Sequence, residues 1–157
     1  ELWALYGSLG YENGILGYPK AAAVAINSTD YTQQFEGGTI TYTQAGGARL
    51  TSATDPWTNT ILTTTYLGSP TRGKACGLVR SGCWQSFQGG YVYSTPTYGP
   101  VAFKSELWAL YGSLGYENGI LGYPKAAAVA INSTDYSQEF EGGFIRNLSG
   151  QISYRLK

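Results

Sequence analysis

Apolar residues at the start of the chain follow a helical spacing. Leu2, Tyr6 and Leu9 fall at positions i, i+4 and i+7, which places them on one face of a helix. Gly10 is a suitable helix stop, because glycine readily takes the left-handed backbone that ends many helices. The pattern therefore predicts a short helix, and the glycine-rich segment 11–14 predicts a tight turn after it.

Short segments of β type come next, separated by turn residues. The segment Leu16-Gly17-Tyr18-Pro19 predicts a corner, because proline bars a helix and glycine permits a close approach of the backbone. Beyond this corner the sequence predicts strands at 22–26, 31–35, 39–43 and 48–50, separated by turns at 27–30 and 46–47. The predicted unit is of the α+β class, with one short helix and a small antiparallel sheet.

The beginning of the chain returns near its end. Residues 1–40 recur at 106–145, an offset of 105 residues. Only three pairs of positions differ between these copies: Thr32 and Ser137, Gln34 and Glu139, Thr39 and Phe144. Because the offset is twice the length of a unit of about 52 residues, a diverged copy should lie between the two.

Two short motifs locate this middle copy. The motif LGxP begins at Leu16, Leu67 and Leu121. The motif FxGG begins at Phe35, Phe87 and Phe140, which is 19, 20 and 19 residues after the corresponding leucine. We therefore expect one repeat domain over residues 1–157, with units at approximately 1–50, 51–103 and 104–157. Each unit is too small to bury its own core, so the units should pack as a compact, pseudo-symmetric array.

The middle unit departs from the other two. Its segment 56–66 is rich in threonine, whose β-branched side chain disfavours a helix. It also carries both cysteines, Cys76 and Cys83. The chain has no histidine and no further thiol, so a zinc site would lack ligands. We therefore predict a disulfide rather than two free thiols, and with it an oxidising compartment.

Composition excludes several classes of partner. The chain has ten basic and ten acidic residues, and they are scattered, whereas nucleic-acid binding needs a basic excess on one face. No apolar run approaches the roughly 20 residues of a membrane span. The sequence begins at Glu1 and contains no methionine, which we interpret as a processed or excised piece of a longer secreted protein with other domains. We expect no nucleic-acid partner and no membrane insertion.

The residues also argue against catalysis. Without histidine, the Ser-His-Asp and Cys-His arrangements and histidine-based metal sites are excluded. Most of the acidic residues occur as repeated pairs in the same sequence context: Glu1 and Glu106, Glu12 and Glu117, Asp30 and Asp135, Glu36 and Glu141. A catalytic pair of carboxylates is usually a unique arrangement, so the repeated acids are better explained as structural. We expect no enzyme activity, no metal and no cofactor in this chain.

The repeated motifs resemble those of the LGFP repeat family. Units of that family run from a helix through the LGxP corner to an FxGG strand and a glycine-alanine turn, and the resemblance extends over nearly the whole chain. Two departures are the tyrosines Tyr6 and Tyr111, where the family usually has tryptophan, and Ser69, which replaces the usual aromatic residue of LGxP. The resemblance implies a secreted, cell-wall-associated module that binds a polysaccharide, with arabinogalactan as a proposed ligand. Such repeats accompany secreted actinobacterial enzymes, including mycoloyltransferases and wall hydrolases.

Aromatic residues outside the core are the best candidates for a ligand site. Sugars present apolar C–H faces that stack on tryptophan and tyrosine rings, while their hydroxyl groups bond to polar side chains. Tyr6 lies on the buried helical face, and the FxGG phenylalanines should plug the cores. The tryptophans lie off that face, so they either pack on a neighbouring repeat or lie exposed. We predict as ligand-binding residues Trp3, Tyr11, Glu12, Trp108, Tyr116 and Glu117.

Alternatives remain for some of these residues. Glu12 could instead bond to backbone amides of its own turn. Asp30, after Asn27, favours an Asx-type turn over a calcium site, because the oxygen ligands are few. For the whole protein, the alternative function is a protein–protein interaction or surface-assembly module, which a dry and contiguous aromatic patch would favour.

Overall fold

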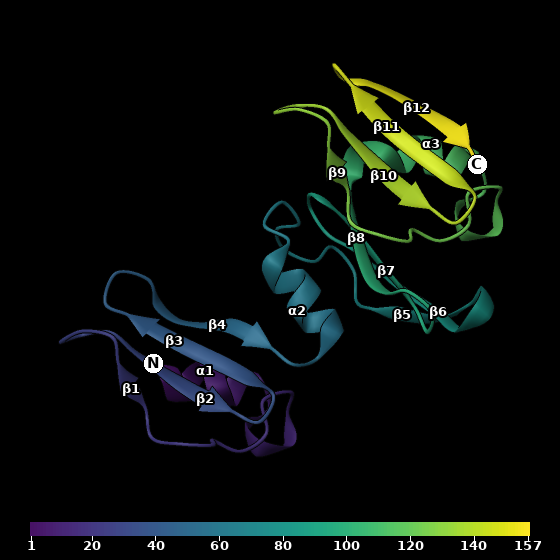
Figure 1. Cartoon of the computed structure of the whole chain (residues 1–157). Helices are drawn as coiled ribbons and strands as arrows, with labels where there is room; N and C mark the ends of the chain where they lie inside the picture. Colours follow the sequence, from purple (N-terminus) through teal and green to yellow (C-terminus); the bar gives the residue numbers. More distant parts are fainter. The chain divides into compact units, whose positions relative to one another are not determined.

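The computed structural model describes all residues 1–157, and the chain divides into two compact units, Glu1–Thr63 and Thr64–Lys157. It contains three antiparallel sheets of four strands each, in the orders β1-β2-β3-β4, β5-β6-β7-β8 and β12-β11-β10-β9. The prediction of an α+β chain built from three tandem repeats is confirmed. Figure 1 shows α1 and α3 behind the strands of their own sheets.

The first unit contains one complete repeat and the helix of the next. Its elements are α1 (Leu2–Ser8), the 3-10 turn η1 (Tyr11–Asn13), β1 (Val24–Ala25), β2 (Tyr31–Phe35), β3 (Gly38–Thr43), β4 (Gly47–Ala53) and α2 (Pro56–Thr63). The predicted helix stop is correct, because Gly10 follows α1 with a left-handed backbone at φ 93°. The first strand is shorter than predicted.

The second unit contains two sheets and the helix between them in sequence. Its elements are β5 (Ala75–Leu78), η2 (Val79–Ser81), β6 (Gly82–Ser86), β7 (Gly90–Thr95), β8 (Gly99–Lys104), η3 (Ser105–Leu107), α3 (Trp108–Ser113), η4 (Tyr116–Asn118), β9 (Val129–Ala130), β10 (Tyr136–Phe140), β11 (Gly143–Leu148) and β12 (Gln151–Leu156). No helix of the chain combines the length and apolar character that a membrane span needs.

The core of the first repeat lies between α1 and one face of its sheet. Tyr6, Leu16, Phe35 and Ile40 form a buried cluster, as expected for the helical face and the FxGG phenylalanine. The hydroxyl of Tyr6 donates to the carbonyl of Gly17 at 2.8 Å, so the helix is tied to the LGxP corner. In the third repeat, Tyr111 makes the equivalent bond to Gly122, also at 2.8 Å.

The two sequence motifs bond directly to each other. The amide of Gly37 donates to the carbonyl of Leu16 at 2.8 Å, and the amide of Glu36 donates to the carbonyl of Tyr18 at 3.0 Å. The side chain of Glu36 accepts the amide of Tyr18 in return, at 3.1 Å. The middle and third repeats have the same backbone bonds. This contact explains why LGxP and FxGG keep a nearly fixed spacing along the chain.

The middle repeat forms a helix after all, and the argument from its threonines was wrong. Helix α2 follows Asp55, whose carboxylate accepts the amide of Thr58 at 2.9 Å and the hydroxyl of Thr58 at 2.7 Å. Pro56 occupies the first helical position, where its missing amide hydrogen costs nothing and its φ is already helical. A good N-terminal cap and this proline outweigh the modest helix propensity of threonine.

Two further local predictions are confirmed. Cys76 and Cys83 form a disulfide that joins the neighbouring strands β5 and β6. The side chain of Asn27 accepts the amides of Thr29 and Asp30 at 2.9 Å, so the segment 27–30 is an Asx-type turn. Asp30 in turn accepts the amide of Gln44 at 2.9 Å, so its carboxylate bonds within the chain.

Helix α3 packs against both sheets of the second unit. One buried cluster combines Leu107 and Tyr111 of this helical segment with Phe103 of the preceding sheet and with Phe140 and Ile145 of the following sheet. The sheets of the first and third repeats therefore have an inner face toward the helix of their own repeat and an opposite, outer face. In the sheet β5–β8, we call the face that carries Phe87 and Val92 the inner one. In the sheet β5–β8, the outer face is covered by the helix of the next repeat.

Candidate functional site

A row of aromatic residues covers the outer face of the sheet β5–β8. Side chains alternate between the two faces of a strand, so Phe87 and Val92 lie on the inner face while Trp84 and Tyr91 lie on the outer one. Trp108 of α3 stacks on this face: its ring centroid lies 3.7 Å from that of Tyr91, with planes 8° apart, and 5.7 Å from that of Trp84. The stack fixes the position of the indole.

The turn after α3 places two more of the predicted residues beside this stack. Gly115 takes a left-handed backbone, and the following 3-10 turn η4 brings Tyr116 back onto Trp108, with 4.7 Å between ring centroids. Its neighbour Glu117 accepts a hydrogen bond from the hydroxyl of Tyr93 at 3.4 Å. Burial raises the pKa of Tyr93, and the nearby carboxylate of Glu117 raises it further, so the phenol remains a donor.

These residues line an open pocket of about 410 Å³. Its wall consists of Arg72, Leu78, Trp84, Tyr93, Trp108, Tyr116 and Glu117. The guanidinium of Arg72 lies over the Trp84 ring, 5.2 Å from its centroid, in a cation–π contact. The pocket thus combines aromatic surfaces with one cationic donor and one anionic acceptor, the chemistry that recognises a polar ligand with apolar faces.

The structure treats the two predicted groups of site residues differently. Trp108, Tyr116 and Glu117 meet at the pocket, whereas Trp3, Tyr11 and Glu12 lie on an exposed surface. Trp3 and Tyr11 still touch, with 5.1 Å between ring centroids, yet 68% of Trp3 is exposed. Both alternatives for the tryptophans therefore occur: Trp108 packs on a neighbouring repeat and Trp3 does not. Ligand contact by either group stays a prediction.

Four pocket residues escaped prediction: Arg72, Leu78, Trp84 and Tyr93. A signal for two of them was present, because Trp84 and Tyr93 face each other on paired strands, where the first repeat has only threonine at Thr32 and Thr41. An aromatic face confined to one repeat indicates that something covers or binds it. Arg72 gave no such signal, because it lies in a loop whose course the sequence does not reveal.

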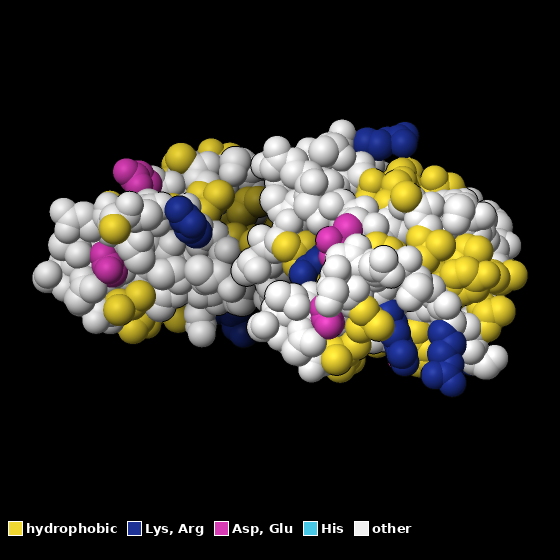
Figure 2. Space-filling model, turned by 90° about the horizontal axis from the view of Figure 1, so that it is seen from above, with side chains coloured by type: hydrophobic (Ala, Val, Ile, Leu, Met, Phe, Trp, Pro, Cys, Tyr) yellow, Lys and Arg dark blue, Asp and Glu magenta, His cyan; other side chains and the backbone are white.

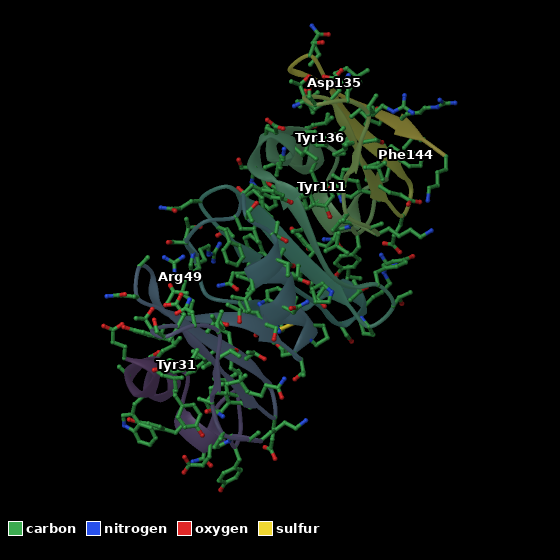
Figure 3. All side chains as sticks on the ribbon, turned by 60° about the vertical axis from the view of Figure 1, so that its left-hand side comes forward. Tyr31, Arg49, Tyr111, Asp135, Tyr136 and Phe144 are labelled. Carbon is green, nitrogen blue, oxygen red and sulfur yellow. A yellow bond between two sulfur atoms is a disulfide. The ribbon has the colours of Figure 1, made fainter.

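A second, smaller cavity offers less to a ligand. It has a volume of about 250 Å³ and is lined by Lys104, Tyr136, Ala128, Ala130 and the turn 132–135. Its polar groups are already engaged: Tyr136 donates to Glu106, and Asp135 accepts the amide of Ser149 at 2.8 Å (Figure 3). The hydrogen bond from Tyr136 lowers the pKa of Glu106, and a bond from Asn147 acts in the same direction.

On the face seen in Figure 2, hydrophobic side chains gather in separate patches, with few charged side chains between them. The first-unit residue Tyr18 is 62% exposed and Trp3 68% exposed, so large aromatic surface is available outside the pocket as well.

Comparison with known proteins agrees with the repeat motifs. Residues 67–119 match the family model described as LGFP repeat. The match begins at Leu67 of the middle LGxP, crosses the sheet β5–β8 and helix α3, and ends at Gly119. It therefore includes every residue that lines the pocket. No curated protein matches the chain.

The resemblance seen in the sequence is thereby confirmed. Together with the disulfide, this repeat indicates an extracellular location. The first and third repeats share the LGxP and FxGG motifs with the matched segment, and they share its contact between those motifs. Residues 67–119 are therefore similar to the LGFP repeat, and the first and third repeats of the chain share its two motifs.

Proposed function

We propose that this protein is a non-catalytic, secreted module that binds a cell-wall polysaccharide, with the pocket beside Trp108 as its binding site. The observation that carries the proposal is the composition of the pocket wall. Trp84, Trp108 and Tyr116 offer rings for the C–H faces of a sugar. Arg72 and Glu117 stand at the same pocket as donor and acceptor for sugar hydroxyl groups.

The pocket also favours a glycan over a protein as ligand. A protein interface would need a contiguous dry patch, whereas this site is an open pocket with charged groups in its wall. Its size suits one or two sugar rings, and a polymer could contact further copies of the module. Weak binding at each site then adds up through a high effective concentration. Arabinogalactan is the candidate polysaccharide that the family resemblance supplies.

The first test is co-sedimentation of the purified chain with insoluble actinobacterial cell wall. We expect the chain to sediment with intact wall and to stay in solution after arabinogalactan has been removed chemically. Equal sedimentation with both preparations would exclude arabinogalactan as the ligand. No sedimentation with either would contradict wall binding altogether.

The repeat supplies matched variants for the site itself. We expect Glu117→Ala to weaken binding by about tenfold or more, because a hydrogen bond to a charged group contributes about 1.5–3 kcal/mol. Its control is Glu12→Ala, a change in the same local sequence but outside the pocket. Tyr116→Ala and Tyr11→Ala form a second matched pair. Because the pocket contains two tryptophans, binding of soluble arabinogalactan fragments can be followed by fluorescence titration. If both members of a pair weaken binding equally, this placement of the site is contradicted.

A further inference from the structure

Two helices of identical sequence have different surroundings. Trp108 of α3 is stacked on Tyr91 of the preceding sheet, whereas Trp3 of α1 is 68% exposed. The corners differ in the same way, because Tyr123 is 1% exposed and donates its hydroxyl to the carbonyl of Val79, while its counterpart Tyr18 is 62% exposed. The surface that binds a sheet in the third repeat is therefore open in the first.

This open surface already has the bound arrangement. Trp3 and Tyr11 lie 5.1 Å apart between ring centroids, with planes 47° apart, against 4.7 Å and 43° for Trp108 and Tyr116. The contact of Tyr6 with Tyr11, at 5.5 Å and 88°, likewise matches that of the third repeat, at 5.7 Å and 87°. We call the surface of Trp3, Tyr11 and Glu12 the open helix face. No rearrangement is needed for it to receive a sheet.

The positions that differ between the copies point to the partner. Thr32, Gln34 and Thr39 of the first repeat correspond to Ser137, Glu139 and Phe144 of the third. All of them lie on outer sheet faces, because they alternate with inward-facing residues such as Phe35, Ile40, Phe140 and Ile145. Within residues 1–40 and 106–145, the two repeats thus share the same helix, corner and core residues, and they differ only on their outer sheet faces.

The divergence gives the third sheet a docking residue that the first lacks. Counted from the FxGG motif, Phe144 holds the position of Tyr91, the residue on which Trp108 stacks, whereas the first sheet has Thr39 there. Figure 3 shows Phe144 on β11, in the sheet that covers Tyr111 with its other face. The amino group of Lys157 lies 5.6 Å from the centroid of the Phe144 ring.

Charge on the two surfaces is complementary. Arg146 holds the position of Tyr93, the residue that bonds to Glu117, and Glu12 is the first-repeat counterpart of Glu117. Arg146 makes no ion pair, and its Nε is shielded from solvent without a hydrogen-bond acceptor. Arg155, paired with Phe144 across β11 and β12, adds a second positive charge. We call the surface of Phe144, Arg146 and Arg155 the basic sheet face.

We propose that the open helix face of one copy of this chain docks on the basic sheet face of a second copy. Trp3 stacks on Phe144 as Trp108 stacks on Tyr91, and Glu12 pairs with Arg146 where Glu117 bonds to Tyr93. The contact joins two different surfaces, so each copy retains one free surface of each kind. Association therefore continues head to tail and produces rings or filaments. This self-assembly goes beyond the proposed glycan binding and does not depend on it.

Sedimentation velocity of the purified full chain at rising concentration tests the proposal. We expect species larger than a dimer whose share grows with concentration. Trp3→Ser removes the stacking residue of the open helix face, and the double variant Phe144→Thr, Arg146→Thr gives the third sheet the residues that the first sheet carries at Thr39 and Thr41. Each variant should sediment as a single chain at all concentrations.

Mixing the two variants separates lost docking from lost folding. Each variant keeps the surface that the other lacks, so an equimolar mixture should form a 1:1 dimer and nothing larger. Thr32→Ser, which makes a first-repeat residue equal to its third-repeat counterpart, serves as the control and should assemble like the unchanged chain. The proposal is overturned if the unchanged chain remains monomeric up to about 1 mM, if the variants still assemble, or if their mixture does not dimerise.

Discussion

The glycines of FxGG are required by close backbone contacts. A β-carbon on Gly142 would lie 2.0 Å from the carbonyl oxygen of Ile120, and one on Gly37 would lie 1.9 Å from that of Ile15. These oxygens belong to the residue just before the LGxP corner. Because the contacting atom is backbone, it cannot turn away as a side chain would. The motif is therefore a requirement of packing between two chain segments, which explains its presence in every repeat.

Substitution of one of these glycines should destabilise the protein. We expect Gly142→Ala to lower the free energy of unfolding by roughly 1–3 kcal/mol, as for other overpacked positions. Gly73→Ala is the matched control, because a β-carbon there meets no atom within 4 Å. Urea unfolding monitored by tryptophan fluorescence gives both values. Equal stability of Gly142→Ala and the unchanged chain would contradict the close contact.

Capping decides where the middle helix forms. The threonines of α2 are poor helix formers, yet Asp55 satisfies the amide of Thr58 at the first turn. Sheet faces depend on context in the same way. The sequence predicts the strands of a repeat, but it does not predict which residues cover the outer face of their sheet. The elements therefore follow from local signals, provided that caps are counted together with propensities.

Removal of the capping side chain of Asp55 should show how much helix α2 depends on it. We expect Asp55→Ala to destabilise the protein by about 0.5–2 kcal/mol, the usual cost of losing an aspartate cap. Asp55→Asn keeps an oxygen acceptor and should leave stability almost unchanged. Thermal unfolding followed by circular dichroism compares the two. Similar losses in both variants would show that the negative charge, and not the capping bond, is what matters.

Across the second unit, an ion pair joins one repeat to the next. Both terminal guanidinium nitrogens of Arg80, in the turn η2, donate to the carboxylate of Glu141 in the third FxGG, at 2.8 and 2.6 Å. Glu141 also accepts the amide of Tyr123 at 2.8 Å. These interactions hold the pKa of Glu141 below its ordinary value of 4.5, and the hydrogen bond from Arg80 has the largest effect on it. The first repeat has Glu36 at this position without an arginine partner.

This pair should make stability depend on acidity. Because the pKa of Glu141 is lower in the folded than in the unfolded state, the pair contributes stability above pH 4.5, and that contribution is lost as the pH falls through the folded-state value. We expect Arg80→Ala to be less stable than the unchanged chain at pH 7, with the difference shrinking in acid to the contribution of the contact between Arg80 and the Tyr123 ring. Urea unfolding from pH 7 to pH 3 measures it. A difference of the same size at pH 7 and below the folded-state pKa of Glu141 would contradict a contribution from the ion pair.

The sequence by itself determined the repeats, most of their elements and much of their cores. Helical spacing identified Tyr6 as buried, the glycines marked the turns, and the cysteines were correctly paired, because each of these depends on neighbours in the chain. Three of the seven pocket residues could be predicted in the same way, since Trp108, Tyr116 and Glu117 belong to one helix and turn.

Only the tertiary structure decided what each repeated surface meets. Trp3 and Trp108 stand in identical sequences, yet one is exposed and the other is stacked on an aromatic sheet face. That difference arises from residues of another repeat, such as Tyr91, and no local pattern around the tryptophan contains them. The same holds for Arg72, which reaches the pocket from a distant loop. Local spacing fixes which side chains an element presents, whereas packing between repeats fixes which of them become a core, a pocket or a free surface.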